Sequence, residues 1–349
     1  MLLMLLSWMA LDAKLDLKPV VTLADVSEST DLYLQNVADA AFTPEGDVYI
    51  IDTRSVMVMA WNADGSFKAH FGKKGQGPGE FSFRGNAGPG GNIGITDQHI
   101  YIYDQGSKFI NIFSRDHKFI KNLPLEITQG SVSLFEVADD ENLLVTNASW
   151  FSDEPYRLFA RYNMQGKLIH QFEKVKDATW RYGSENGDRR VILIPYATTM
   201  ISAYDEVSSH VLAGDNATPN FSVYDLNGKL VRKVELALSR AEVTRDDEDE
   251  WNAQTWFKNQ KFLKVAFPDN KPYYNRIMPL ADGGYLVYVQ STYYNQCDGI
   301  FTDKTGKTLG RFSYRMGEGG NLIGSRGKLL GIIANDEGEL SLKILKPGK

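Results

Sequence analysis

The sequence is poor in the residues that build metal and redox centres. It has a single cysteine, Cys297, so no internal disulfide forms and a cysteine-based zinc site is excluded. The five histidines show neither H-x-H nor H-E-x-x-H spacing, which disfavours a zinc site built from histidine. A Walker loop, a G-x-G-x-x-G motif and a serine in G-x-S-x-G are also absent. We therefore expect no metal ion, no cofactor and no nucleophilic catalytic serine.

An excess of positive charge is missing as well. Lys and Arg number 38 against 44 Asp and Glu, which gives a net charge of −6. Phosphate backbones are bound through clustered Lys and Arg, so the sequence predicts no nucleic-acid binding.

Long apolar runs are confined to residues 1–11, which read MLLMLLSWMAL. A membrane-spanning helix needs about 20 apolar residues, so no integral span is expected. The run does fit the apolar core of a secretory signal, which is about 7–15 residues long. We interpret residues 1–16 as a signal remnant and expect a periplasmic or extracellular protein. The alternative is a buried N-terminal segment, which leaves a cytoplasmic location open.

What the sequence has in abundance is a repeated strand unit. Aromatic residues make up 12% of the chain and glycine occurs 31 times, a mixture that favours short strands and tight turns. Two copies, at 40–72 and 93–123, align almost residue for residue, with Asp52 matched to Asp104 and Trp61 to Phe113. Four looser copies follow, at 135–172, 211–234, 277–312 and 322–345.

Each unit reads as a four-stranded meander. Its strands alternate in side-chain direction, so one sheet cannot bury both of its faces alone, and stacking several sheets around an axis solves this. We predict an all-β fold, a six-bladed β-propeller occupying residues 17–347 as one domain. The sixth copy shows three strands, and we expect residues 19–24 to supply the fourth and close the ring.

The first copy, together with residues 71–81 (FGKKGQGPGEF), resembles an NHL-repeat blade. It is similar to the six-bladed propellers common in secreted and envelope proteins of Bacteroidetes, in which a strand ends in Asp and a G-x-G-P-G-E-F segment links two blades. Residues 268–274 resemble the start of that family's fifth blade. The resemblance covers about residues 17–347. It implies a platform for binding ligands or proteins, although some relatives are enzymes.

Long insertions interrupt the repeats at 72–91, 174–196 and 239–274. Blade topology places such segments on one face of the ring, and loops of this length usually carry function. Within the third, 239–265 is the one helical candidate, since Ser239 and Glu242 fit a capping box. The helix is either a lid over the channel mouth or a docked element with buried aromatics and solvated acids.

The candidate ligand-binding residues are aromatic and basic side chains expected on that face: Arg54, Arg84, Lys108, Trp150, Tyr156, Trp251, Tyr293 and Tyr294. Such residues dominate many interfaces, and ordinary packing between loops is the alternative interpretation. Asp52 and Asp104 recur at one position of the repeat, which favours a structural role in capping the following turn.

We expect a non-enzymatic binding platform for a protein, peptide or glycan. The alternative is a propeller enzyme, such as a metal-dependent lactonase or lyase. That chemistry needs inward-facing Asp, Glu, Asn or His around a divalent ion, a set that spacing alone does not reveal. A purely structural role is the third possibility. The sequence does not indicate which oligomeric state the protein adopts.

Overall fold

Short strands build nearly all of the regular structure. The computed structural model describes residues 14–28, 32–85, 88–127, 130–150, 152, 154–185, 188–253, 263–289, 296–317 and 320–348. Within these residues, six antiparallel sheets have four strands each, one sheet has three strands and one has two. The helical elements described are α1 (Arg245–Ala253) and the short 3-10 helix η1 (Val26–Glu28). The all-β prediction is therefore confirmed.

Five of the four-stranded sheets use strands that follow one another in the chain. Sheet 1 contains β2 (Val37–Phe42), β3 (Val48–Asp52), β4 (Met57–Trp61) and β5 (Phe67–Phe71). Sheet 2 contains β8 (Gly91–Ile95), β9 (His99–Asp104), β10 (Phe109–Ser114) and β11 (Phe119–Pro124). Sheet 3 contains β12 (Ser131–Val137), β13 (Asn142–Ser149), β14 (Tyr156–Asn163) and β15 (Leu168–Lys176).

Sheet 4 contains β18 (Met200–Asp205), β19 (His210–Asp215), β20 (Asn220–Tyr224) and β21 (Leu230–Glu235). Sheet 5 contains β23 (Arg276–Pro279), β24 (Tyr285–Val289), β25 (Gln296–Thr302) and β26 (Thr308–Arg315). The repeat pattern had indicated the last three strands of sheet 4 and missed β18, whose first half does not alternate between buried and exposed residues.

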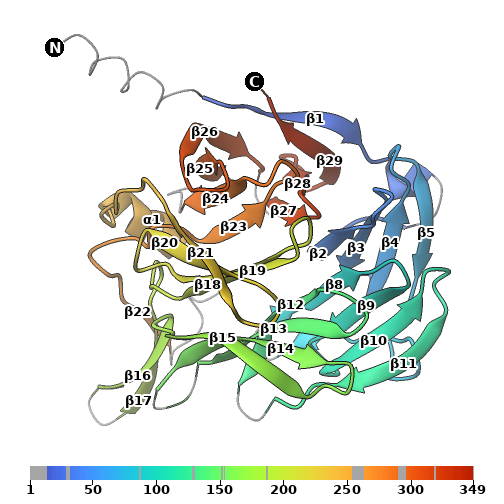
Figure 1. Ribbon diagram of the computed structural model, residues 1–349, viewed down its shortest axis with the longest axis horizontal. Helices are drawn as coiled ribbons and strands as arrows, with labels where there is room; N and C mark the ends of the chain where they lie inside the picture. Colours follow the sequence, from blue (N-terminus) through green and yellow to red (C-terminus); the bar gives the residue numbers. More distant parts are fainter. Residues whose placement is uncertain are drawn as a thin grey trace.

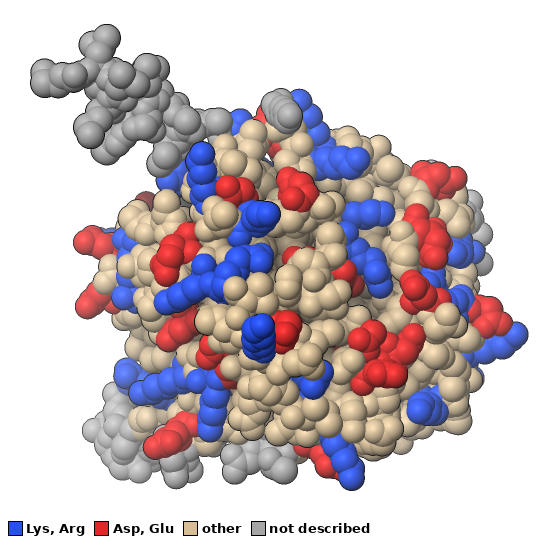
Figure 2. All heavy atoms as spheres, viewed as in Figure 1, with Lys and Arg blue, Asp and Glu red and all other residues tan. Residues whose placement is uncertain are grey.

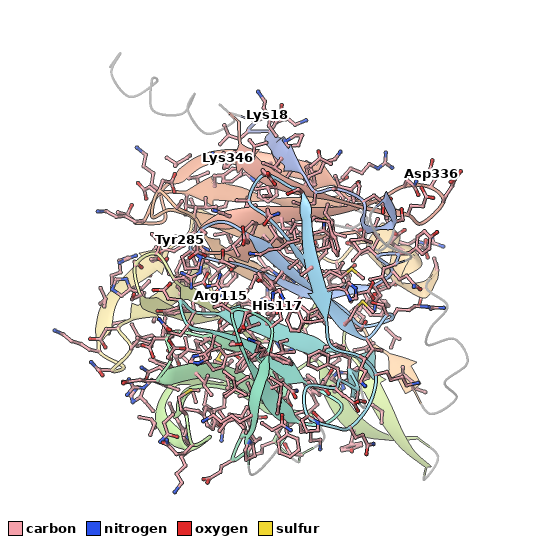
Figure 3. All side chains as sticks on the ribbon, turned by 90° about the vertical axis from the view of Figure 1, so that its right-hand side faces the viewer. Lys18, Arg115, His117, Tyr285, Asp336 and Lys346 are labelled. Atoms are coloured by element: carbon pink, nitrogen blue, oxygen red, sulfur yellow. The ribbon has the colours of Figure 1, made fainter. Side chains whose placement is uncertain are left out.

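The sixth sheet joins the two ends of the chain. It contains β27 (Asn321–Ser325), β28 (Lys328–Ala334), β29 (Leu340–Pro347) and, on its outer edge, β1 (Leu17–Thr22). β1 pairs with β29, with Lys18 opposite Lys346 (Figure 3). The predicted pairing of the N-terminal strand with the last sheet is thus confirmed. Lys18 and Pro19 of this edge strand discourage further strands from adding to it.

The core is divided into six hydrophobic clusters, each of which lies mainly between two neighbouring sheets. The first contains Phe42 and Trp61 of sheet 1 with Leu330 and Ile344 of sheet 6, so the last sheet packs on the first. Because strand side chains alternate, each sheet buries both faces against neighbours. The result is a propeller-like ring whose strands β2, β8, β12, β18, β23 and β27 converge on the centre (Figure 1).

The repeated aspartates hold the second strand of a sheet to the segment that precedes its first strand. The carboxylate of Asp52 accepts hydrogen bonds from the backbone N–H groups of Gln35 (2.7 Å) and Arg54 (2.8 Å). Asp104 likewise accepts from Phe83 and Gly106, at 2.8 and 2.9 Å. The predicted capping role is confirmed, and the same carboxylate also fixes the connection between sheets.

Two of the long insertions meet in the three-stranded sheet. The hairpin of β16 (Trp180–Glu185) and β17 (Asp188–Leu193) comes from the insertion between sheets 3 and 4. β22 (Leu263–Val265), from the insertion between sheets 4 and 5, pairs in parallel with β17. The insertion between sheets 1 and 2 forms the short hairpin of β6 (Arg84–Gly85) and β7 (Gly88–Pro89).

The predicted helix over 239–265 is wrong in its bounds. α1 starts six residues later than expected, and β22 occupies the end of the predicted range. Thr244, rather than Ser239, caps it: the Thr244 N–H donates to Asp247 Oδ2 (2.8 Å), and the Asp247 N–H donates to Thr244 Oγ1 (3.3 Å). Asp247 is fully buried and its Oδ1 accepts from Lys271 Nζ at 2.6 Å, so this acid is not solvated as expected.

Figure 2 shows Lys and Arg side chains interspersed with Asp and Glu over the visible face, with no broad area of one sign. No helix among the described residues is long and apolar enough to span a membrane.

Candidate functional site in the axial channel

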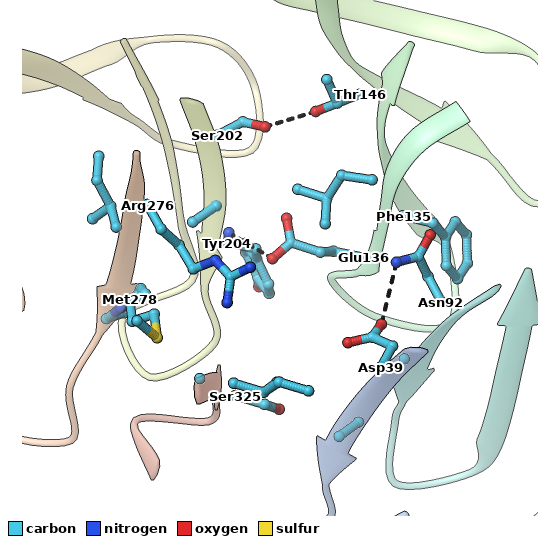
Figure 4. A pocket seen from close by; sticks show the side chains of 18 of the residues that line it. Asp39, Asn92, Phe135, Glu136, Thr146, Ser202, Tyr204, Arg276, Met278 and Ser325 are labelled. Atoms are coloured by element: carbon cyan, nitrogen blue, oxygen red, sulfur yellow. Dashed lines mark hydrogen bonds between the residues drawn. The ribbon is translucent and has the colours of Figure 1, made fainter. Parts of the chain in front are cut away.

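A cavity of about 350 Å³ lies at the centre of the ring. The innermost strands of all six four-stranded sheets line it: β2, β8, β12, β18, β23 and β27. Its volume is at the lower end of the range for small-molecule sites, about 300–1,000 Å³. Figure 4 shows Asp39, Glu136 and Arg276 extending into it from three different strands.

Glu136 is the most unusual of these side chains. It stands on β12 between Phe135 and Val137, and because strand residues alternate, the two apolar neighbours pack into the core while Glu136 faces the channel. Its Oε1 accepts a hydrogen bond from the Tyr204 N–H at 3.1 Å. Its Oε2 is buried and has no hydrogen-bond partner among the described residues.

Burial raises the pKa of Glu136 to about 8. The hydrogen bond from the Tyr204 N–H opposes this shift, whereas the negative charges of Glu206 and Asp39 add to it. The neutral carboxylic acid is therefore favoured near neutral pH in the absence of a ligand.

Asp39 extends from β2 and has several donors. Its Oδ2 accepts from the Ile93 N–H (3.0 Å) and from Asn92 Nδ2 (3.3 Å), and its Oδ1 accepts from the Ala40 N–H (2.9 Å). Burial raises the pKa of Asp39 to about 6, although these hydrogen bonds and the charge of Arg276 oppose the shift. Asp39 thus fastens β2 to β8 and keeps a titratable group on the channel wall.

Arg276 is the first residue of β23, and its guanidinium is directed toward the centre of the channel (Figure 4). Nη1 donates to the carbonyl oxygen of Leu322 at 2.6 Å and to Asn321 Oδ1 at 3.4 Å. The side chain is held from one side by β27 and is otherwise exposed to the cavity. We call this end of the channel, where β23 and β27 begin, the mouth.

The opposite end, which we call the floor, is closed by Arg326 and Glu206. Arg326 follows β27 and donates from Nε to the Phe42 carbonyl (3.1 Å) and from Nη2 to the Ile95 carbonyl (2.7 Å). Its Nε also lies 3.8 Å from Glu206 Oε1, and its backbone N–H donates to Glu206 Oε2. Arg326 therefore joins the ends of β2, β8 and β27 to the residue that follows β18.

A second cavity of about 320 Å³ adjoins the mouth. Trp180, Tyr196 and Trp251 line it, together with backbone and side chains of 193–197. Asn275 borders both cavities, immediately before Arg276. The two insertions that meet through β17 and β22 thus form an apolar pocket beside a polar channel.

The sequence-predicted residues lie apart from one another. Arg54 and Lys108 are exposed in the loops between the second and third strands of sheets 1 and 2. Trp150 follows β13, and its Nε1 donates to the buried Asp177 at 3.1 Å. Tyr156 begins β14, with the ammonium of Lys174 4.1 Å from its ring centroid.

Of the remaining predicted residues, Trp251 is half-buried on α1 and borders the second cavity. Arg84 starts β6, and its side chain is outside what the structure describes. Tyr293 and Tyr294 lie outside the described residues.

Sequence reasoning missed the charged residues of the channel. The signal for Glu136 was a charged residue between two apolar residues of a predicted strand; Asp39 and Arg276 lay just outside their predicted units. Within the described part of the chain, no group of three or more His, Cys, Asp or Glu residues is arranged to hold a metal ion.

No protein-family model matches the sequence, and no curated protein matches it significantly. Solved structures do match. A Bacteroides fragilis protein described as exported is 14% identical, with a TM-score of 0.57 over 97% of this chain and 96% of its own. A member of the DUF4221 family from Bacteroides vulgatus is 12% identical, with a TM-score of 0.55 over 96% and 99%. At these identities the likeness shows the fold alone.

Proposed function

We propose that this protein is a non-enzymatic binding protein that holds a small polar ligand, or the end of a peptide or glycan, in the axial channel. The observation that carries the proposal is Glu136, whose Oε2 is buried without a partner beside a cavity of about 350 Å³. An unsatisfied buried polar atom costs about 1–3 kcal/mol, and a ligand donor at this position would remove that cost.

The six four-stranded sheets are proposed to be the complete ring of a six-bladed propeller over residues 17–347. The six interfaces between neighbouring sheets and the pairing of β1 with β29 support this count. The exposed Arg54 and Lys108, the half-buried Trp150 and Tyr156, and Arg84, Tyr293 and Tyr294 are proposed as contacts around the mouth for the rest of a larger ligand. The apolar run at 1–11 supports export, and the Bacteroides fragilis structure is itself described as exported.

The test is a thermal-shift screen with amino acids, dipeptides, organic acids, polyamines, monosaccharides and disaccharides. A ligand present at 100 times its dissociation constant stabilises a protein by about 2.7 kcal/mol, so a true ligand gives a clear rise in Tm. We expect at least one such compound, and we expect Glu136→Gln or Arg276→Met to reduce its effect.

Glu337→Gln is the matched control, because Glu337 is exposed in the turn before β29. The proposal is overturned if no compound raises Tm, or if the shifts persist in both channel variants.

A further inference from the structure

The two walls of the channel differ in their ionisable groups, with carboxyl groups on one side and a guanidinium on the other. On one side, Asp39 and Glu136 present carboxyl groups, and Glu136 Oε2 has no partner among the described residues. A ligand group with several N–H donors and a positive charge would satisfy this oxygen. An anion alone would meet both carboxyl groups and be repelled.

On the other side, Arg276 presents a guanidinium. Its Nη1 donates to the Leu322 carbonyl and to Asn321 Oδ1, and Figure 4 shows the guanidinium directed toward Glu136 across the channel. A guanidinium recognises carboxylates in a fork geometry. A ligand with only positive charge would meet Arg276 unfavourably, so one molecule with both charges fits better than either ion.

The floor does not share in this recognition. Arg326 is occupied by the carbonyl oxygens of Phe42 and Ile95 and by Glu206. The groups that remain for a ligand are thus the carboxyl groups of Asp39 and Glu136 on one side of the channel and the Arg276 guanidinium on the other.

The apolar pocket indicates that the ligand also carries an apolar group, in addition to a positive and a negative charge. It opens beside Asn275, one residue from Arg276, and is lined by the rings of Trp180, Tyr196 and Trp251. A substituent on a molecule bound at Arg276 would reach this pocket past Asn275. Aromatic walls favour an aromatic or large apolar group, through burial and ring–ring contact.

We propose that the channel binds an α-amino acid with an aromatic side chain. Its ammonium group lies at Glu136 and Asp39, its carboxylate at Arg276, and its ring in the pocket of Trp180, Tyr196 and Trp251. This inference rests on the proposed function and specifies its ligand class.

Isothermal titration calorimetry with L-tryptophan and L-phenylalanine tests the proposal. Three probes each remove one feature: tryptamine lacks the carboxylate, indole-3-propionate lacks the ammonium and glycine lacks the ring. We expect at least one aromatic amino acid to bind, and each reduced probe to bind at least tenfold more weakly. Binding at pH 7 should also release protons, measured in buffers of different ionisation enthalpy, because the ligand's ammonium favours ionised Glu136.

The variants Glu136→Gln and Arg276→Met should each weaken binding of the aromatic amino acid at least tenfold. Glu337→Gln and Arg315→Met are the matched controls, since both side chains are exposed far from the channel, and they should leave it unchanged. Trp251→Ala should weaken tryptophan binding while leaving glycine binding unchanged.

The outcomes separate the two proposals. If a neutral monosaccharide binds, Glu136→Gln abolishes its binding and the amino acids do not bind, the channel is a ligand site and the amino-acid assignment is overturned. If tryptamine binds as tightly as tryptophan, the role of Arg276 and the zwitterionic assignment are wrong. If amino acids bind but the channel variants have no effect, both proposals fail.

Discussion

The two ends of the axial channel differ in how their charges are satisfied. At the floor, Arg326 and Glu206 contact each other and the carbonyl oxygens of Phe42 and Ile95. At the mouth, Arg276 is held from one side by β27, and deeper in the channel Glu136 has a buried oxygen without a partner among the described residues. Both sets of side chains contain an arginine and a glutamate, so charge alone does not mark a site. The difference teaches that the contacts at the floor are structural, whereas the channel above the floor has the unused hydrogen-bonding capacity that a ligand requires.

The largest loss of stability is expected when the contacts of Arg326 at the floor are removed. Arg326→Met leaves Glu206 buried without its cation and removes donors from two carbonyl groups, so the free energy of unfolding should fall by about 3–5 kcal/mol. Arg276→Met, at the mouth, should cost less than about 1 kcal/mol. Urea denaturation of the two variants measures both values.

A double variant sharpens this comparison. Arg326→Met combined with Glu206→Leu replaces the pair by apolar groups and should regain most of the loss. Equal losses from Arg326→Met and Arg276→Met would contradict the distinction between the two ends.

The second prediction concerns pH. The pKa of Glu136 is raised from 4.5 to about 8 by burial, in a setting that also contains Asp39, Glu206, Arg276 and the Tyr204 N–H. Below pH 4.5 the acid is neutral in both states, and its contribution to stability is fully present. As the pH rises toward 8 the unfolded chain ionises first, so the free energy of unfolding should fall, by about 4–5 kcal/mol in total.

Melting curves between pH 5 and 9 test this. Glu136→Gln removes the ionisation and should flatten the decline above pH 6, where Asp39, with a pKa of about 6, contributes little further change. A decline of the same steepness in Glu136→Gln would show that another group is responsible.

A smaller loss of stability is expected for a substitution of Trp150. This residue follows β13, and its indole N–H has a buried hydrogen-bond partner. Its Nε1 donates to Asp177, which also accepts from Arg157 Nε at 2.7 Å and from the Thr179 N–H at 2.9 Å. Trp150→Phe should therefore cost about 1–2 kcal/mol in chemical denaturation, because Asp177 keeps its other donors. A loss of stability near zero would contradict this structural role and favour the interpretation of Trp150 as a ligand-binding residue.

The smallest effect on stability is expected at Arg54, which is exposed. Arg54→Ala should change the free energy of unfolding by less than about 0.5 kcal/mol. If Arg54 contacts a larger ligand, the same change should weaken that ligand's binding by about 1–3 kcal/mol in calorimetry. A large loss of stability would assign Arg54 a structural role instead.

Much of the architecture could be predicted because the repeat is local. The short apolar runs in Val48–Asp52 and Met57–Trp61, the glycine turns and the recurring Asp52 and Asp104 are all set by residues close in sequence. The helix was misplaced because two capping patterns, at Ser239 and Thr244, are equally plausible locally. The second prevails where Asp247 meets Lys271, 24 residues away.

The channel chemistry could not be predicted for the same reason. Glu136, Asp39 and Arg276 come from three sheets, and only closure of the ring brings them to one axis. The sequence separations between these three residues follow no regular pattern that would indicate their proximity. The predicted aromatic and basic residues, by contrast, were selected by their expected loop positions alone, and Arg54, Lys108 and Trp150 follow strands of three different sheets.

The pairing of β1 with β29 also constrains when the molecule can finish folding. Among the strands, β1 is synthesised first and its partner β29 last. During synthesis or passage across a membrane, β1 therefore has no partner until β29 is available. Sheets 1 to 5 can form as their strands emerge, but sheet 1 keeps Phe42 and Trp61 uncovered until sheet 6 arrives. The same pairing places Leu17 opposite Pro347, so a short linker between these two residues, with new termini between two other sheets, would yield a ring in which β1 follows β29 directly in the chain.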